Sequence, residues 1–392
     1  MLFLFFIPVQ LYAGASTSDM NYKRWGHVGT FMPSVGLLEG VVLITGGYSD
    51  TTGGKYFISN KVEIYSALYK KYIKTGSMNK PRAIHQAILL NDGKVLVMGG
   101  ITDLSTGLLT SSCEIFDPRT EKFTFTDSMA YKRYAFTATL LSTGEVLVTG
   151  GAMRETGTGK EAEIYDPATG KWRKVASMSV GRTGHQAVSV IPNPGLKKDQ
   201  ILITGGAVEF MGKNVYDNNT AEVYSYLTNT WVAVKPMNKP RAYHIAARLE
   251  GTHYAEPIVL VAGGYADTTS TDNVVVIKDA EIYIPSRNIW VNVPPMNTPR
   301  VYFTANTLSP CNTDVLVAGG FTNPTTLNAA KDIELFHFLG TFPIWFRGPD
   351  MLDGRGYHTA TFIPVGYPNM ILVSGGAQTG FAAILQKSEL IP

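Results

Sequence analysis

The sequence predicts an all-β protein, a seven-bladed β-propeller whose blades are four-stranded antiparallel sheets. Three recurring features predict it: an opening Met-x-x-x-Arg-x-x-(His/Phe), a glycine pair at the end of a short apolar run, and a Glu followed by two apolar or aromatic residues. Each feature occurs seven times, and successive opening methionines are 58, 51, 49, 59, 59 and 55 residues apart. A period of about fifty residues with four short strand-like runs per unit is typical of a propeller blade.

The key residues stand at the same places in every repeat. The openings are Met20/Arg24/His27, Met78/Arg82/His85, Met129/Arg133/Phe136, Met178/Arg182/His185, Met237/Arg241/His244, Met296/Arg300/Phe303 and Met351/Arg355/His358. The glycine pairs are Gly46-Gly47, Gly99-Gly100, Gly150-Gly151, Gly205-Gly206, Gly263-Gly264, Gly319-Gly320 and Gly375-Gly376. The triplets are Glu63-Ile64-Tyr65, Glu114-Ile115-Phe116, Glu163-Ile164-Tyr165, Glu222-Val223-Tyr224, Glu281-Ile282-Tyr283, Glu334-Leu335-Phe336 and Glu389-Leu390-Ile391.

Each repeat divides into four expected strands. Strand a follows the arginine, strand b is the apolar run before the glycine pair, and strand c holds the triplet. Strand d carries an aromatic residue shortly before the next methionine; these aromatics are Tyr72, Phe123, Trp172, Trp231, Trp290 and Trp345. The last repeat ends at Pro392, directly after its strand c, so its fourth strand is missing from that end of the chain.

Composition sets broad limits on partners. A repeat that runs through nearly all of the 392 residues argues for one closed array, which we expect to be a monomer. A net charge of +3 without any basic run argues against a nucleic-acid partner. The two cysteines, Cys113 and Cys311, lie about four repeats apart, so both are predicted to be free thiols.

The first 15 residues form a separate segment, and the propeller is expected to occupy residues 16–392. Residues 2–15 are an uncharged apolar run that ends in Ala13-Gly14-Ala15, which is typical of a secretory cleavage site. This run is too short to be a transmembrane segment. A signal peptide implies a secreted or extracellular protein. The alternative is a terminal strand that closes the ring in a cytoplasmic protein.

Several of these features together resemble the kelch repeat. They are the glycine pair after a strand, the segment Glu163 to Trp172 (EIYDPATGKW) and the Pro-Arg-x-x-His opening. The resemblance covers residues 20–392 and implies a kelch-type propeller of seven blades.

The repeated charges have a structural and a functional interpretation. Every repeat that carries the arginine also carries the strand-c glutamate, which favours buried ion pairs over a ring of arginines for an anionic ligand. The residues concerned are Arg24, Arg82, Arg133, Arg182, Arg241, Arg300 and Arg355 with Glu63, Glu114, Glu163, Glu222, Glu281, Glu334 and Glu389.

We predict no catalytic residue, metal ligand or cofactor. Five of the seven histidines share one repeat position, and phenylalanine fills that position in the other two repeats, so packing is its expected role. Kelch-type copper radical oxidases take ligands from openings similar to Tyr243-His244, Tyr357-His358 and Tyr302. The cysteine that those enzymes link to a ligand tyrosine is absent from the corresponding strand a.

The most variable segments are the b–c connections, which emerge on the same face as the d–a connections. Loops on a rigid scaffold commonly carry recognition. Eight aromatics in them are candidate anchors for a partner: Tyr48, Tyr56, Phe57, Phe210, Tyr216, Tyr265, Phe321 and Phe381. Those directly after a glycine pair, namely Tyr48, Tyr265 and Phe321, could equally be packed into the scaffold.

We therefore expect a non-catalytic binding module for a protein or a glycan. The alternatives are an intracellular scaffold for a protein complex and, last, a carbohydrate-acting enzyme or copper radical oxidase.

Overall fold

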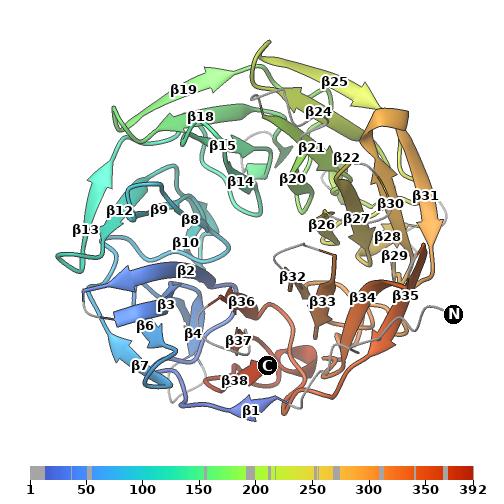
Figure 1. The fold of residues 1–392 in the computed structure, drawn as a ribbon. Helices are drawn as coiled ribbons and strands as arrows, with labels where there is room; N and C mark the ends of the chain where they lie inside the picture. The colour runs from blue at the N-terminus through green and yellow to red at the C-terminus, as the bar shows by residue number, and fades with distance from the viewer. Residues whose placement is uncertain are drawn as a thin grey trace, which may run out of the picture.

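Seven β-sheets form a closed ring. The computed structural model describes residues 14–391, except residues 37, 51–54, 154–156, 191–198, 211–212, 217, 251–253, 255, 268–273, 309–312, 340 and 365–369. Regular structure in the described residues is β-strand apart from two short 3-10 turns, η1 (Pro285–Arg287) and η2 (Thr379–Phe381). Figure 1 shows the seven four-stranded sheets around a common axis, which confirms the predicted fold.

Each blade is an antiparallel meander in the order a, b, c, d, with strand a innermost (Figure 1). Blades one to three are β2 (Val28–Val35), β3 (Leu38–Thr45), β6 (Val62–Ser66) and β7 (Lys71–Lys74); β8 (Gln86–Leu89), β9 (Val95–Met98), β12 (Cys113–Asp117) and β13 (Lys122–Thr126); β14 (Thr137–Leu140), β15 (Val146–Thr149), β18 (Ala162–Asp166) and β19 (Lys171–Val175). Blades four and five are β20 (Gln186–Val190), β21 (Gln200–Thr204), β24 (Ala221–Ser225) and β25 (Thr230–Val234); β26 (Ile245–Leu249), β27 (Ile258–Ala262), β30 (Ala280–Ile284) and β31 (Ile289–Val293). Blades six and seven are β32 (Thr304–Thr307), β33 (Val315–Ala318), β34 (Ile333–Leu339) and β35 (Phe342–Arg347); β36 (Thr359–Ile363), β37 (Met370–Ser374), β38 (Ser388–Ile391) and β1 (Ala15–Ser16).

The burial pattern explains the composition of the strands. Strands b such as β9 and β27 are buried at every residue, because both faces of each blade pack against a neighbouring blade. Strands d such as β25 contain only half-buried and exposed residues, because they lie at the rim. The predicted strand-d aromatics each lie against the aromatic of strand c, with ring centroids 4.9 to 5.2 Å apart.

The glycine pairs form the seams between blades. A Cβ on Gly46 would lie 2.2 Å from the carbonyl oxygen of Arg82 in the next repeat, and Gly46 has a positive φ of 60°. The N–H of Gly47 donates to that same carbonyl at 2.9 Å. The equivalent bond occurs at all seven seams, and the last one, from Gly376 to the Arg24 carbonyl at 2.9 Å, joins the final repeat to the first.

The N-terminal segment supplies the missing fourth strand of blade seven. Ala15 pairs with Leu390 and Ser16 pairs with Glu389, so β1 lies on the outer edge of β38 (Figure 1). The closing strand therefore straddles the expected boundary between residues 15 and 16. Residues 1–13 lie outside the described part of the chain.

Five of the b–c connections contain small hairpins that the sequence did not predict. They are β4 (Tyr48–Asp50) with β5 (Tyr56–Ile58), β10 (Ile101–Asp103) with β11 (Leu108–Leu109), β16 (Ala152–Met153) with β17 (Gly157–Thr158), β22 (Val208–Phe210) with β23 (Lys213–Val215), and β28 (Tyr265–Asp267) with β29 (Val274–Val276). Within the described ranges, the chain contains no helix of the length and apolarity needed to span a bilayer.

Candidate binding face

Seven buried ion pairs fix the connections that lead into the inner strands. In the third repeat, Arg133 Nη2 donates to Glu163 Oε1 at 2.9 Å. Its Nη1 donates to the carbonyl oxygens of Gly150 and Glu161 at 2.7 and 3.0 Å. Glu163 Oε2 accepts the backbone N–H of Ala130 at 2.6 Å, so the buried charges are both paired and hydrogen-bonded. The Arg–Glu distance is between 2.7 and 3.0 Å in every repeat: Arg24–Glu63, Arg82–Glu114, Arg133–Glu163, Arg182–Glu222, Arg241–Glu281, Arg300–Glu334 and Arg355–Glu389.

These pairs leave the arginines unavailable as a ring for an anionic ligand. All seven side chains are at most 1% exposed. Burial lowers the pKa of Arg133 even though Glu163 opposes that effect. The arginines therefore belong to the scaffold of the face.

The repeat histidines fill the seams. Each of the five rings brings Nε2 within 2.8 to 3.1 Å of a threonine hydroxyl on the preceding blade. Burial, followed by the positive charge of Arg182, lowers the pKa of His185 to about 3. Phe136 occupies the same place against Gly99, so the position needs a planar ring rather than a titrating group.

Two residues after each arginine, the chain adopts a left-handed conformation beside the central axis. These residues are Gly26, Ile84, Ala135, Gly184, Tyr243, Tyr302 and Tyr357, and their φ angles lie between 50° and 61°. We call this set the mouth ring. Its backbone groups bond to one another around the axis: Ile84 donates to Gly26 at 2.8 Å, Tyr243 donates to Gly184 at 2.7 Å, and Gly26 donates to Tyr357 at 3.1 Å. These bonds hold a conformation that is costly for a β-branched residue such as Ile84.

The mouth ring is crowded on one side and open on the other. Tyr302 and Tyr357 stack with centroids 4.0 Å apart at an interplanar angle of 25°, and Tyr243 lies 4.6 Å from Tyr302. The opposite side carries only Ile84 and smaller residues.

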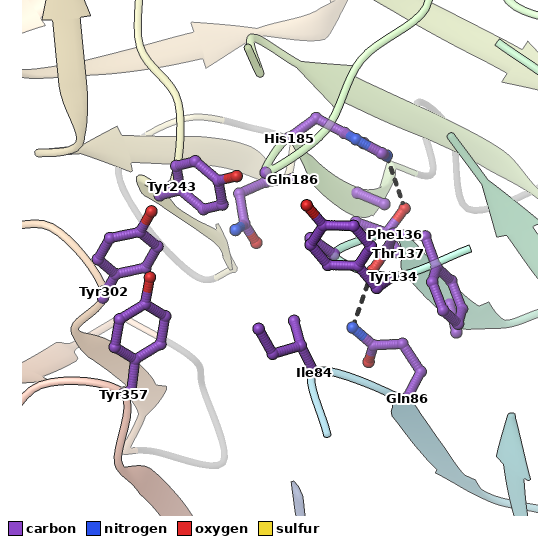
Figure 2. A pocket seen from close by; sticks show the side chains of 14 residues that line it. Ile84, Gln86, Tyr134, Phe136, Thr137, His185, Gln186, Tyr243, Tyr302 and Tyr357 are labelled. Atoms are coloured by element: carbon purple, nitrogen blue, oxygen red, sulfur yellow. Dashed lines mark hydrogen bonds between the residues drawn. The ribbon is translucent and has the colours of Figure 1, made fainter. Parts of the chain in front are cut away.

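A pocket of about 480 Å³ occupies the open side, a volume in the usual range for ligand sites (Figure 2). It is lined by Ile84, Gln86, Tyr134, Ala135, Phe136, Thr137, Ala138, Gly184, His185, Gln186, Ala187, Tyr243, Tyr302 and Tyr357. Figure 2 shows the side chain of Gln186 between Tyr243 and Tyr134. Gln86 donates its Nε2 to the Phe136 carbonyl at 2.8 Å, which fixes the orientation of that amide.

The lining of this mouth pocket contains no carboxylate, lysine or arginine. Burial raises the pKa of Tyr243, Tyr302 and Tyr357, and the pKa of His185 is lowered to about 3. All four groups are therefore uncharged near neutral pH, and the pocket is electrically neutral.

Sequence reasoning missed the mouth pocket, although a signal was present. The two positions between each arginine and the following His or Phe vary, and the second of them ranges from glycine to tyrosine, while the arginine and the His/Phe position keep their type. Variation within an otherwise regular repeat marks a place that the scaffold does not specify.

Three of the eight candidate anchors are buried, so of the two alternatives that the sequence left open for them, the structure has the one in which they pack into the scaffold. Tyr48 is 5% exposed and stacks on Trp25 at 4.1 Å. Tyr265 is 7% exposed, and its ring lies 5.6 Å from that of Tyr302. Phe321 is fully buried against Gly356. These rings build the wall behind the mouth tyrosines.

The other candidates differ in exposure. Phe381 is half-buried with its ring 4.9 Å from that of Trp25, and Tyr216 is half-buried with its ring 5.4 Å from that of Tyr265. The side chain of Phe210 lies outside the described part of the structure.

Tyr56 and Phe57 are the exposed members of the set, at 47% and 43%. Leu104 and Leu108, on the hairpin of the next blade, are 47% and 46% exposed. Strands β5 and β10 contact each other, so the two hairpins are neighbours on the same face. We call these four residues the hairpin patch.

The two histidines that the copper oxidases imply as ligands are engaged in the seams between blades. The Nε2 atoms of His244 and His358 lie in the seams, 2.8 and 3.0 Å from the hydroxyls of Thr204 and Thr304. Cys113 is a buried free thiol whose pKa is raised to about 12 by burial, and Cys311 is outside the described residues. Among the residues whose positions are described, no three His, Cys, Asp or Glu side chains form a group that could hold a metal ion.

Comparison with known proteins agrees with the repeat pattern. The Kelch motif matches residues 87–130 and 133–179. The chain is 26% identical over 256 residues to Kelch-like protein 26 of Danio rerio, covering 65% of this chain and 39% of that protein. It is 24% identical over 293 residues to Kelch-like protein terF of Aspergillus terreus, covering 72% of this chain and 58% of that protein. The chain thus spans less than two thirds of the length of each of these relatives.

Solved structures share the architecture. A fungal alcohol oxidase of the AA5 family, in complex with copper, superposes with a TM-score of 0.68 at 14% identity, covering 97% of this chain and 76% of that one. At this identity the likeness concerns the fold alone.

The ring of blades and the loop face with its central pocket define the chain as a seven-bladed β-propeller with a binding face. The repeated seam contacts and the matched motif make it a kelch-repeat β-propeller.

Proposed function

We propose that this propeller is a non-catalytic interaction module that binds a protein partner through the face bearing its b–c and d–a connections. The hairpin patch is the observation that carries this proposal. Its four apolar side chains are each more than two-fifths exposed and lie on two adjoining hairpins. Clustered exposed apolar and aromatic side chains are typical of protein interaction sites.

The similarity to kelch-like proteins supports a protein partner over a glycan. The faces of the mouth tyrosines, which a sugar ring would need for stacking, are largely occupied. Tyr302 stacks on Tyr357, and Tyr243 lies between Tyr302 and the backbone of Gly184. A glycan partner therefore remains the second candidate.

A double substitution tests the proposal directly. Phe57→Ala with Leu108→Ala removes two exposed side chains of the hairpin patch without opening the core. The matched control is Leu68→Ala with Leu227→Ala, at side chains 70% and 57% exposed. These leucines lie in c–d turns, on the opposite face of the meander.

Each variant is compared with wild type by affinity capture from cells, followed by mass spectrometry, and by thermal unfolding. We expect a partner that is retained by wild type and control but lost from the hairpin variant, with unchanged melting temperatures. A partner retained equally by all three forms would refute the proposed face.

The non-catalytic part of the proposal has its own test. The purified protein is loaded with copper, and peroxide release is measured with a panel of alcohols and sugars. Stoichiometric copper with turnover would contradict the proposal.

The cellular compartment is tested by the N-terminal residue of the expressed protein. Cleavage after Ala15 would establish secretion and would leave only Ser16 of the closing strand β1. An intact N-terminus on retained protein would favour the intracellular scaffold.

A further inference from the structure

We propose that the mouth pocket binds an uncharged carboxamide side chain, an asparagine or glutamine, carried by the partner protein. This inference rests on the proposed function, because it names the group that the interaction face selects.

The neutrality of the pocket excludes a charged anchor. A carboxylate or ammonium group entering the pocket would lose its water without meeting an opposite charge, because the 14 lining residues include no charged side chain at neutral pH. The nearest repeated charges, the seven arginines, are each paired with a glutamate. A neutral group enters the pocket without the cost of desolvating an unpaired charge.

The polar atoms of the pocket require hydrogen-bonding partners of both kinds. The side chain of Gln186 is half-buried in the lining of the pocket, and its amide lies between two tyrosines (Figure 2). An amide offers one acceptor and two donor hydrogens, so its best complement is another amide, which can exchange two hydrogen bonds with it. An apolar anchor would cover the Gln186 amide without offering it a hydrogen bond, which costs free energy.

The position of the pocket, on the same face as the hairpin patch, favours a peptide segment over a free small molecule. Ile84 belongs to the open side of the mouth, and its blade also carries Leu104 and Leu108 of the hairpin patch. A partner segment lying on the hairpin patch can therefore place one side chain in the mouth pocket. The volume of about 480 Å³ admits a side chain together with its neighbouring backbone.

The test uses a displayed library of linear 12-residue peptides selected on wild-type protein. Selected peptides are synthesised with Asn or with Asp at the shared position, an isosteric pair that differs in charge. Affinities are measured for wild type, for Gln186→Glu, which keeps the side-chain shape, and for Gln186→Lys. Circular dichroism melting establishes that each variant is folded.

We expect the selected peptides to share an Asn or Gln. Asp at that position should weaken binding to wild type by at least about tenfold, and Gln186→Glu should weaken the Asn peptide by a similar factor. Gln186→Lys should reverse the preference and bind the Asp peptide better than the Asn peptide.

Three results would overturn the inference. They are selected peptides that share a charged anchor, affinities that Gln186→Glu leaves unchanged, and no enrichment of any peptide by wild type over Gln186→Glu. A neutral oligosaccharide that binds wild type on a glycan array and loses binding with Gln186→Glu would also overturn it, and would assign the pocket to a glycan.

The carboxamide anchor can be refuted while the proposed interaction face is retained. Peptides that lose affinity with Phe57→Ala and Leu108→Ala but not with Gln186→Glu would preserve the interaction face and refute only the carboxamide anchor.

Discussion

Replacing Glu163 with glutamine should destabilise the protein far more than an equivalent change at the surface. Glu163→Gln removes the negative charge that faces Arg133 at 2.9 Å, where both side chains are at most 1% exposed. It also threatens the bond from the backbone N–H of Ala130 at 2.6 Å, because an amide nitrogen cannot accept it. Breaking a buried ion pair from one side costs about 3–5 kcal/mol, since the remaining charge stays buried without its partner.

The melting temperature provides the readout. With an unfolding entropy of about 2.1 cal/mol/K per residue, a chain of this length should lose about 4–6 °C. The control is Asp279→Asn, which breaks the Lys239–Asp279 pair at 2.6 Å where the side chains are 52% and 38% exposed. An exposed pair contributes about 1 kcal/mol or less. Urea unfolding of both variants gives the free energies directly.

A further variant separates the effect of the two charges on stability from the effect of side-chain packing. Arg133→Met combined with Glu163→Leu removes both charges and should cost less than Glu163→Gln alone. If Glu163→Gln stays within about 0.5 kcal/mol of Asp279→Asn, the buried pair is not a required element of the repeat, and the reasoning is refuted.

Three further predictions follow from the seams and the closing strand. The folded pKa of His185, about 3, is lower than its unfolded value of about 6.5, so its contribution is complete above pH 6.5 and is lost as the pH falls. Between pH 7 and 5.5 the loss of unfolding free energy due to His185 amounts to about 1 kcal/mol. Urea unfolding at both pH values should show that His185→Phe removes this loss. An unchanged pH dependence in the variant would contradict the assignment of a buried, neutral His185. Gly205→Ala places a methyl group 2.2 Å from the Arg241 carbonyl oxygen and should lower the urea midpoint much more than the control Gly93→Ala. At Gly93 the space is open, and only the left-handed φ costs about 1–2 kcal/mol. Equal midpoints for the two variants would contradict the seam packing. Deleting residues 1–16, but not residues 1–13, should speed hydrogen exchange in β38, and identical exchange in the two truncations would show that β1 does not close the ring.

The scaffold was predictable because each repeated residue makes a repeated contact. The first glycine of a pair must admit the carbonyl of the next repeat, as Gly46 admits Arg82, and no other residue could do so. The arginine and the glutamate must occur together because neither could be buried alone. Contacts that recur seven times leave seven copies of the same spacing in the sequence.

The site was less predictable because it depends on contacts that do not recur. Tyr48 resembles an exposed loop aromatic until the structure pairs its backbone with that of Trp25, which buries the ring. The mouth pocket arises where Ile84, Gly184 and Tyr357 from three separate blades meet. Which side chains meet across the axis follows from ring closure and cannot be read from any single repeat.

In the mouth ring the backbone is fixed, while the side chains vary from blade to blade. Its backbone is held by bonds between neighbouring blades, and those bonds do not involve the side chains. A change of side chain at a mouth-ring position where its neighbours leave room therefore alters the surface of the mouth and leaves the seams and ion pairs intact; Gly184, where a Cβ would lie 2.5 Å from the ring of Tyr243, does not leave that room. Each blade contributes one residue to the mouth. A substitution at one of these positions can therefore change what the mouth binds while the fold stays the same.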